Sequence, residues 1–349
     1  MRRVSRIAVA GVATAAFAVS VSACGSSSTS SSSGDDNKNL GLALAYDVGG
    51  KGDQSFNDAA TAGLEKADKE FGYKSTAVEP QDGESDADKV QRLESLAKQG
   101  YNPVIGVGFA YAPAVKAAAA KYPKTTFGIV DDEQTKADNV ADLVFSEEQA
   151  SYLAGVAAAK ATKSNVVGFV GGVDVPLIHK FEAGYKQGVE DTKKGVTVKS
   201  QYLTETAAEG GFSSPDKGES AADGQIDAGA DVVYAAAGLS GQGVIKAANA
   251  NKVWAIGVDS DQYKQDALKT YKDSILTSAM KNVEGAVYTL AKSVEDGKPA
   301  TGVVRGDLAN GGVSLANSNP VFAGNKEIQD AVKKAEEGIK NGTIKVKTS

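Results

Sequence analysis

The sequence predicts an α/β protein with two doubly wound parallel-sheet domains. From Leu40 onward, short apolar runs alternate with amphipathic stretches, and the same rhythm starts again at Val166. Repeated alternation of strand and helix patterns is typical of parallel sheets that are covered by helices. The 349 residues are enough for two such sheets, each with its own core. Residues 145–149 are the expected first crossing between them.

The individual elements follow from the periodicity of apolar residues. Strands are predicted at residues 40–47, 74–79, 103–108, 126–131, 141–145, 166–171, 196–203, 231–236, 253–259 and 274–280. A helix is predicted after Ser85, because Ser85 and Asp88 have the spacing of a capping box and an apolar stripe follows. Residues 150–161 and 282–296 carry similar stripes and predict two further helices.

The N-terminal segment predicts an exported lipoprotein. Arginines precede seventeen uncharged residues, 7–23, and small residues stand directly before Cys24, which is the only cysteine of the chain. This is the pattern of a secretory signal with a lipoprotein-type cleavage site, so we expect removal of residues 1–23 and acylation of Cys24. A retained membrane anchor is disfavoured because a span needs about 20 apolar residues. Residues 24–37 are rich in serine and predict a flexible tether.

The expected mature chain is acidic. Cleavage before Cys24 leaves 326 residues and removes three arginines, so 35 Lys and Arg face 44 Asp and Glu and the net charge is −9. Nucleic acids and anionic membrane surfaces need clustered positive charge, so we expect neither as the main partner. We expect a monomer at the extracytoplasmic face of the cell membrane, held there by the lipid on Cys24.

Polar residues and glycines follow the carboxyl ends of several predicted strands. They are Asp47, Gly108-Phe109, Asp131-Asp132, Gly171-Gly172, Gly238 and Asp259-Ser260-Asp261. A single aspartate after a strand is commonly a helix cap or a turn residue. Open parallel sheets bind ligands at this edge, however, and glycine lets a ligand approach the backbone. The recurrence therefore indicates a ligand site.

The segment DVGGKGDQSFND at residues 47–58 is the densest of these strand ends. Its glycines allow a tight loop, and Ser55, with Asp58 three residues on, is placed to cap the next helix. Phe56 and Asn57 then fall in the first helical turn, at the cleft edge of the sheet. The Phe56 ring either packs in the core or offers a flat heteroaromatic ligand a face to stack on, with polar neighbours for the ligand's edge.

Several short motifs occur together in a characteristic order and spacing. They are DVGG and SFN within 47–57, GVGF at 106–109, FGIVDD at 127–132, EEQASYLAG at 147–155, the pattern Phe181-x-x-Gly184-Tyr185-x-x-Gly188, GQGV at 241–244, IGVDSDQ at 256–262 and TSAMKN at 277–282. In these motifs the sequence resembles the basic membrane protein family, the purine nucleoside receptor type of substrate-binding lipoprotein that serves ABC transporters. The resemblance covers nearly the whole mature chain.

This resemblance implies a type I periplasmic-binding-protein-like fold whose domains are joined by a hinge. It implies that Phe56 and Phe181 sandwich the purine, one from each domain. It also implies that Asp47 and Asn57 hydrogen-bond polar atoms of the nucleoside. The implied partners are a purine nucleoside and the permease subunits of an ABC importer.

The same resemblance implies a ribose site and an exchange of segments between the domains. Asp259 and Lys281 look like the pair that holds the ribose hydroxyls. The remaining residues implied to line the cleft are Phe109, Asp131 and the Gly238 backbone. Domain one is expected at residues 38–145 and 282–300, and domain two at residues 146–281 and 301–349.

Other functions have less support in the sequence. The chain has one histidine, His179, and one cysteine, Cys24, which we expect to be acylated, so His/Cys metal clusters and Cys/His nucleophile pairs are excluded. We expect no enzyme activity, no cofactor and no metal site. The alternatives are a sugar-binding lipoprotein of an ABC importer, a surface docking protein, and a nucleoside hydrolase that would use Asp131, Asp259 and Asp261 with a divalent ion.

Overall fold

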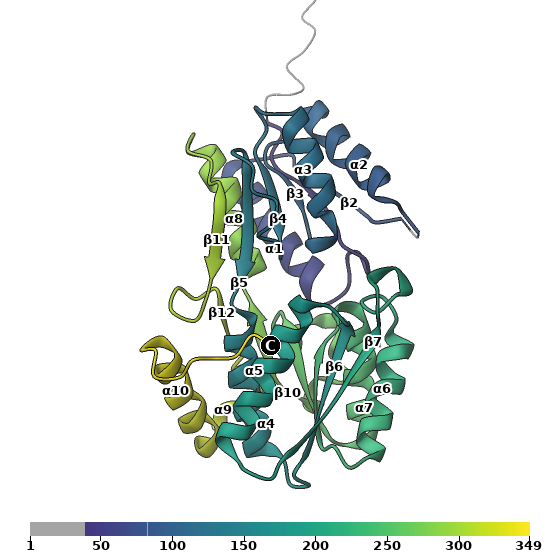
Figure 1. The fold of residues 1–349 in the computed structure, drawn as a ribbon, viewed down its shortest axis with the longest axis vertical. Coiled ribbons are helices and arrows are strands. Elements are labelled where there is room, and N and C mark those ends of the chain that lie inside the picture. Colours follow the sequence, from purple (N-terminus) through teal and green to yellow (C-terminus); the bar gives the residue numbers. More distant parts are fainter. Residues whose placement is uncertain (1–38, 82) are drawn as a thin grey trace, which may run out of the picture. The chain divides into compact units, whose positions relative to one another are not determined.

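The computed structural model describes residues 39–81 and 83–349, which contain two six-stranded sheets (Figure 1). The strand order is β11-β5-β4-β3-β1-β2 in the first sheet and β12-β10-β9-β8-β6-β7 in the second. The pairs β1–β2, β1–β3 and β6–β8 are parallel, as are most others, whereas β10 and β12 are antiparallel. The two predicted doubly wound parallel sheets are therefore confirmed.

The part of the chain that the structure describes contains twelve strands, ten α-helices and six short 3-10 helices. The strands are β1 (Ala43–Ala45), β2 (Thr76–Val78), β3 (Val104–Gly106), β4 (Phe127–Val130), β5 (Val140–Phe145), β6 (Val166–Val173), β7 (Thr197–Thr204), β8 (Val232–Ala236), β9 (Trp254–Asp259), β10 (Ile275–Lys281), β11 (Gly302–Gly306) and β12 (Val313–Leu315). The α-helices are α1 (Phe56–Phe71), α2 (Asp86–Gln99), α3 (Ala112–Lys121), α4 (Glu147–Ala161), α5 (Pro176–Thr192), α6 (Pro215–Asp227), α7 (Gly241–Asn251), α8 (Val283–Glu295), α9 (Pro320–Gly324) and α10 (Lys326–Lys340). Short 3-10 helices are η1 (Phe109–Tyr111), η2 (Ala207–Glu209), η3 (Gly238–Ser240), η4 (Gln262–Lys264), η5 (Asp266–Leu268) and η6 (Lys272–Ser274).

Each sheet carries its own helices, and we call the two units the first lobe and the second lobe. In the first lobe, α1 packs against α8, and α2 against α3. In the second lobe, α4 packs against α5, and α6 against α7. The central strands are fully buried, as in β3, β4 and β8, which is expected for parallel strands covered on both faces.

Local signals in the sequence explain several element ends. The predicted capping box of α2 is present, since the Asp88 backbone N–H donates to Ser85 Oγ and the Ser85 N–H donates to Asp88 Oδ2. Gly100 then ends the helix in the left-handed conformation, at φ 100°. None of the helices that the structure describes has the length and apolar character needed to cross a membrane.

The ten predicted strands overlap β1 to β10, whereas β11 and β12 were not predicted. We expected residues 301–349 in the second domain, but β11 pairs in parallel with β5 of the first sheet. The chain therefore crosses back after Gly306, and β12 then pairs with β10. Strand β11 was not predicted because it is an edge strand whose first four residues are exposed. Burial therefore imposes no apolar pattern on its sequence. The other domain boundaries stay a prediction.

Candidate functional site

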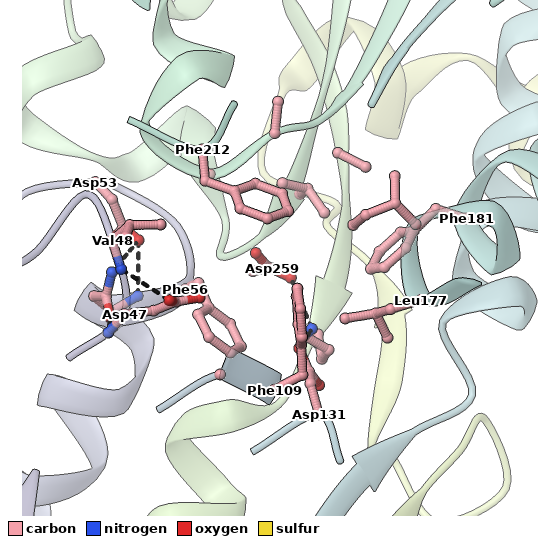
Figure 2. Close-up of a pocket in the computed structure, with 18 residues that line it drawn as sticks. Asp47, Val48, Asp53, Phe56, Phe109, Asp131, Leu177, Phe181, Phe212 and Asp259 are labelled. Carbon is pink, nitrogen blue, oxygen red and sulfur yellow. Dashed lines mark hydrogen bonds and ion pairs between the residues drawn. The ribbon is translucent and has the colours of Figure 1, made fainter. Parts of the chain in front are cut away.

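The carboxyl ends of strands from both sheets line one cleft (Figure 2). The space between its lining residues is about 510 Å³, which includes solvent at the open side of the cleft. The nine residues singled out in the sequence all line it: Asp47, Phe56, Asn57, Phe109, Asp131, Phe181, Gly238, Asp259 and Lys281. The fold thus brings together residues that are up to 234 positions apart, from Asp47 to Lys281.

The elements explain this convergence. Asp131 follows β4 directly, whereas Asp259 and Lys281 are the last residues of β9 and β10. In a parallel sheet the carboxyl ends of the strands lie at one edge. Asp131 lies at that edge of the first sheet, Asp259 and Lys281 lie at that edge of the second sheet, and both edges line the cleft. Phe56 comes from the first turn of α1 and Phe181 from α5, and they add apolar walls from the two lobes.

A buried lysine links two of these carboxylates. Lys281 Nζ lies 2.6 Å from Asp131 Oδ2 and 3.7 Å from Asp259 Oδ1. The three side chains are 4 to 7% exposed. Burial by itself lowers the pKa of Lys281, but the negative charges of Asp131, Asp259 and Glu147 outweigh it and raise that pKa, so Lys281 is a stable cation. The expected pair is in fact a group of three, with Asp131 as the nearer partner of the lysine.

The two carboxylates retain capacity to accept hydrogen bonds. Oδ1 of Asp131 and Oδ1 of Asp259 are buried and have no hydrogen-bond partner among residues 39–81 and 83–349. Both aspartates also have left-handed backbones, with φ 68° and 63°. For a residue other than glycine this conformation costs about 1 to 3 kcal/mol, and such strain is concentrated at functional sites. The site is therefore suited to donors such as hydroxyl groups.

The loop before α1 is organised by Asp53, which the sequence analysis did not single out. Asp53 is 2% exposed and lines the cleft. Its carboxylate accepts from the backbone N–H groups of Ser55, Asn57 and Asp58 at 2.9, 2.8 and 3.2 Å. Burial raises its pKa to about 6, although these hydrogen bonds oppose the shift. Asp53 is the residue that caps the start of α1.

The expectation that Ser55 caps α1 is wrong. Its side chain makes no capping hydrogen bond, because Asp53 already accepts from the first N–H groups of the helix. The Ser55 hydroxyl instead lies 2.8 Å from Asp259 Oδ2 and 3.3 Å from the Val258 carbonyl oxygen, both in the second lobe.

Asn57 and Asp47 are coupled through this loop. Asn57 Oδ1 accepts from the Asp47 backbone N–H at 3.0 Å, and Asn57 Nδ2 donates to Asp53 Oδ2 at 3.2 Å. These bonds leave Asn57 one side-chain N–H for a ligand. Asp47 Oδ1 accepts from the Val48 N–H at 2.8 Å, and burial raises the pKa of Asp47 to about 7. At neutral pH this carboxyl group can therefore either accept or donate a hydrogen bond.

Aromatic rings form the apolar part of the cleft. Figure 2 shows the rings of Phe56, Phe181 and Phe212 around one common space. Lys281 Nζ lies 4.6 Å from the centre of the Phe56 ring and 5.5 Å from that of Phe181. Phe181 is 4% exposed, whereas Phe56 and Phe212 are half-buried. The half-buried rings offer more accessible faces for stacking.

Phe212 is a second residue that the sequence analysis missed. It belongs to the loop between η2 and α6, away from any strand end. The only sign of it in the sequence was the presence of glycine at positions 172 and 238. A Cβ at Gly172 would lie 2.3 Å from the Phe212 ring, and one at Gly238 would lie 3.2 Å from the Phe212 carbonyl oxygen. The glycines that we took as points of ligand approach thus also make room for this phenylalanine.

Two charged residues complete the surroundings. Glu147, the first residue of α4, is 2% exposed, and its Oε2 lies 3.9 Å from Lys180 Nζ. Burial raises its pKa to about 8, while the Lys281 charge opposes the shift. Asp261, which a hydrolase would need, is not among the residues that line the cleft, and its Oδ2 accepts from Ser318 Oγ.

The predictions for the N-terminal segment and for metal binding remain to be compared with the structure. Cys24 and the predicted signal peptide and tether lie outside the described residues. Within residues 39–81 and 83–349, no three His, Cys, Asp or Glu side chains are grouped so that they could hold a metal ion.

The chain is similar to known transport proteins over most of its length. The family model Bmp, described as ABC transporter substrate-binding protein PnrA-like, matches residues 42–349. The ABC transporter nucleoside-binding protein BmpA of Lactococcus lactis subsp. cremoris is 39% identical, over 86% of this chain and 87% of that protein. An uncharacterized lipoprotein of Pyrococcus furiosus is 32% identical, over 87% of this chain and 84% of that protein.

Solved structures agree with the fold. The crystal structure of an ABC transporter solute-binding protein from Aeropyrum pernix K1 matches with a TM-score of 0.76 and 27% sequence identity, over 89% of this chain and 94% of that chain. The expected type I periplasmic-binding-protein-like fold is thereby confirmed. Both family and fold are those of solute-binding proteins and not of enzymes. The chain belongs to the Bmp family of PnrA-like ABC transporter substrate-binding proteins.

Proposed function

We propose that this protein is an extracytoplasmic lipoprotein that binds purine nucleosides in the cleft and delivers them to an ABC importer. The observation that carries the proposal is the combination of aromatic rings with the Lys281–Asp131–Asp259 group in one cavity. The rings suit a flat base, and the charged group suits a sugar with neighbouring hydroxyls. A relative at 39% identity is named a nucleoside-binding protein, which supports the same class of ligand.

The base would stack on Phe56 from the first lobe and on a phenylalanine of the second lobe. Phe181 is the partner implied by the family resemblance, and the half-buried Phe212 is placed to share this role. Each stacked ring would contribute about 0.5 to 1.5 kcal/mol beyond its buried area. Asp47 and the free N–H of Asn57 would then bind polar atoms at the edge of the base.

The ribose would bind the charged group. An ionised carboxylate can accept from two neighbouring hydroxyls, and a hydrogen bond to a charged group is worth about 1.5 to 3 kcal/mol. Lys281 would balance the carboxylates and donate a further hydrogen bond. A ligand without the hydroxyls would leave Asp259 Oδ1 buried without a partner, so the site would discriminate strongly against it.

Calorimetry on the mature protein tests this proposal. We expect adenosine, guanosine or inosine to bind at least about tenfold more tightly than its 2′,3′-dideoxy analogue, because one charge-assisted hydrogen bond is worth at least that factor. Asp259→Ala should remove most of this preference. Native mass spectrometry of protein purified without added ligand should show the mass of a co-purified nucleoside. Binding of free pentoses in place of all three nucleosides would support the sugar receptor instead.

The proposal extends to location and partners. An acylated Cys24 would hold the protein at the outer face of the cell membrane, beside the permease subunits that receive the nucleoside. The relative from Pyrococcus furiosus is named a lipoprotein, which supports an anchored form. We propose that the protein acts as a monomer, with no cofactor.

A further inference from the structure

Ser55 makes contacts that its place in the sequence does not explain. It precedes α1 directly and is fully buried, with 0% of its surface exposed. Because Asp53 accepts from the N–H groups of Asn57 and Asp58, the Ser55 hydroxyl is not needed as a helix cap. The preceding residue, Gln54, has a left-handed backbone with φ 56°.

Hydrogen bonds centred on Ser55 join the two lobes. The Ser55 hydroxyl donates to Asp259 Oδ2 at 2.8 Å, and the Ser260 hydroxyl donates to the Ser55 carbonyl oxygen at 2.7 Å. Gln262 Nε2 donates to the Gln54 carbonyl oxygen at 3.0 Å. The loop before α1 therefore hydrogen-bonds to the segment around the end of β9, and Ser55 itself makes three of these contacts, with Val258, Asp259 and Ser260.

The contact with Ser55 gives the two oxygens of the Asp259 carboxylate different surroundings. Oδ2 accepts from Ser55, whereas Oδ1 has no hydrogen-bond partner in the described part of the chain and lies 3.7 Å from Lys281 Nζ. A partial rotation of the carboxylate about its Cβ–Cγ bond would break the bond to Ser55, whereas a half-turn only exchanges two equivalent oxygens. The hydroxyl of one lobe thus fixes the plane of the carboxylate in the other lobe, and with it the direction of the oxygen that remains open to a ligand.

We propose that Ser55 is a positioning residue for ligand specificity: by donating across the lobes to Asp259 Oδ2, it orients Oδ1 toward the hydroxyls of the bound sugar. The inference rests on the proposed nucleoside binding and adds a condition to it. The carboxylate is correctly oriented only while the loop before α1 contacts β9, so sugar recognition is coupled to contact between the lobes. A serine used only as a structural contact would not distinguish ligands by their hydroxyls.

Calorimetry with Ser55→Ala tests the proposal, and Ser260→Ala is the matched control. Each variant loses a hydroxyl that hydrogen-bonds across the lobes, but of the two hydroxyls only that of Ser55 donates to the Asp259 carboxylate. The probes are the tightest-binding nucleoside among adenosine, guanosine and inosine and its 2′,3′-dideoxy analogue. We expect Ser55→Ala to weaken nucleoside binding about tenfold more than dideoxynucleoside binding. Ser260→Ala should weaken both ligands by the same factor.

A double variant separates orientation from simple contact. In an Asp259→Ala background there is no carboxylate to orient, so adding Ser55→Ala should leave the ratio of the two affinities unchanged. Ser55→Cys, which nearly preserves side-chain volume but donates poorly, replaces Ser55→Ala if the alanine variant does not fold. An unchanged affinity ratio in either Ser55 variant would overturn the inference. Failure of the wild type to bind any nucleoside would instead overturn the proposed function.

Discussion

Buried carboxyl groups crowd around one amino group at the cleft. Asp131 and Asp259 pair with Lys281, so a single cation balances two charges at hydrogen-bond or ion-pair distance. Glu147 is a third buried carboxyl group, and when it is ionised its charge helps to raise the pKa of Lys281. Its pKa is raised to about 8, first by burial and also by the Asp131 charge, so at neutral pH the folded protein holds it mainly in the protonated form.

This protonation gives a pH dependence that Glu147→Gln should remove. The unfolded chain releases the proton near the ordinary pKa of 4.5 and the folded chain near 8, so the folded state binds more protons between these values. The free energy of unfolding therefore falls as pH rises from about 5 to 8, by at most about 1.4 kcal/mol per pH unit for one group. Urea unfolding of Glu147→Gln should show a shallower fall over this range.

The exposed Glu205 provides the control for that comparison. Glu205→Gln also removes one carboxylate, but it should keep the wild-type dependence on pH. If Glu147→Gln keeps the wild-type slope as well, Glu147 is ionised in the folded protein and the assignment of its proton is wrong.

The sequence predicted individual site residues where a polar residue directly follows or ends a strand. Asp131 and Asp259 stand directly at strand ends, so the sequence alone placed them in the cleft. Phe212 lacks this relation, because it lies in a loop. Glu147 comes two residues after β5, but we took its segment as the crossing between the domains and did not inspect it as a strand end. Ser55 shows a different limit: serine before a helix is typically a cap, and only the structure reveals that Asp53 takes that place.

Helices α4 and α5 show how element packing shapes the cleft. Both lie in the second lobe, and α5 carries Phe181. A Cβ at Gly184 would lie 2.1 Å from the Glu148 carbonyl oxygen, and one at Gly188 would lie 2.1 Å from that of Tyr152. The two helix backbones are therefore in direct contact, which explains the glycine spacing that follows Phe181 in the sequence.

Gly188→Ala should separate these helices. The added methyl group cannot fit 2.1 Å from a backbone oxygen, so the helices must shift. Overpacking of this kind typically lowers the free energy of unfolding by about 1 to 3 kcal/mol. We expect a lower urea midpoint, and weaker nucleoside binding because the shift moves Phe181.

Gly224→Ala in α6 is the matched control, because no heavy atom lies within 4 Å of its added methyl group. Alanine is favoured over glycine inside a helix by roughly 0.5 to 1 kcal/mol, so this variant should be slightly stabilised. Equal midpoints for Gly188→Ala and the wild type would show that the α4–α5 contact is looser than the structure indicates.

In the described part of the chain, the strands buried on both faces were all predicted, whereas two of the four edge strands, β11 and β12, were not. The central strands are apolar throughout, and their burial imposes that pattern on the sequence. In contrast, β11 exposes Val303 and Val304 and pairs with β5 alone, so its sequence carries no such pattern. Its position in the first sheet depends on long-range pairing, which periodicity cannot reveal.

The whole molecule combines a family fold with a cleft whose residues come from both lobes. The alternation of strands and helices was enough to predict two parallel sheets. The rule that parallel strands end at one edge of a sheet indicated a ligand site at Asp47, Asp131 and Asp259. Phe181 and Lys281 were assigned to the same cleft only by the family resemblance. The contacts across the lobes, including those of Ser55, could not be predicted, because they depend on how two independent sheets meet.

The final prediction concerns membrane attachment, which depends on residues outside the described part of the chain. We expect a diacylglycerol group on Cys24, with residues 25–37 as the tether to the lobes. Burial of an acyl chain contributes about 0.8 kcal/mol per CH₂, and two chains give stable anchoring where one is marginal. Wild-type protein should therefore stay in the membrane fraction in high salt and leave it in detergent. Cys24→Ser should release the protein into the soluble fraction with unchanged nucleoside affinity, because the cleft lies wholly within residues 47–281. If the serine variant sediments with membranes as the wild type does, attachment has another cause and the lipoprotein assignment fails.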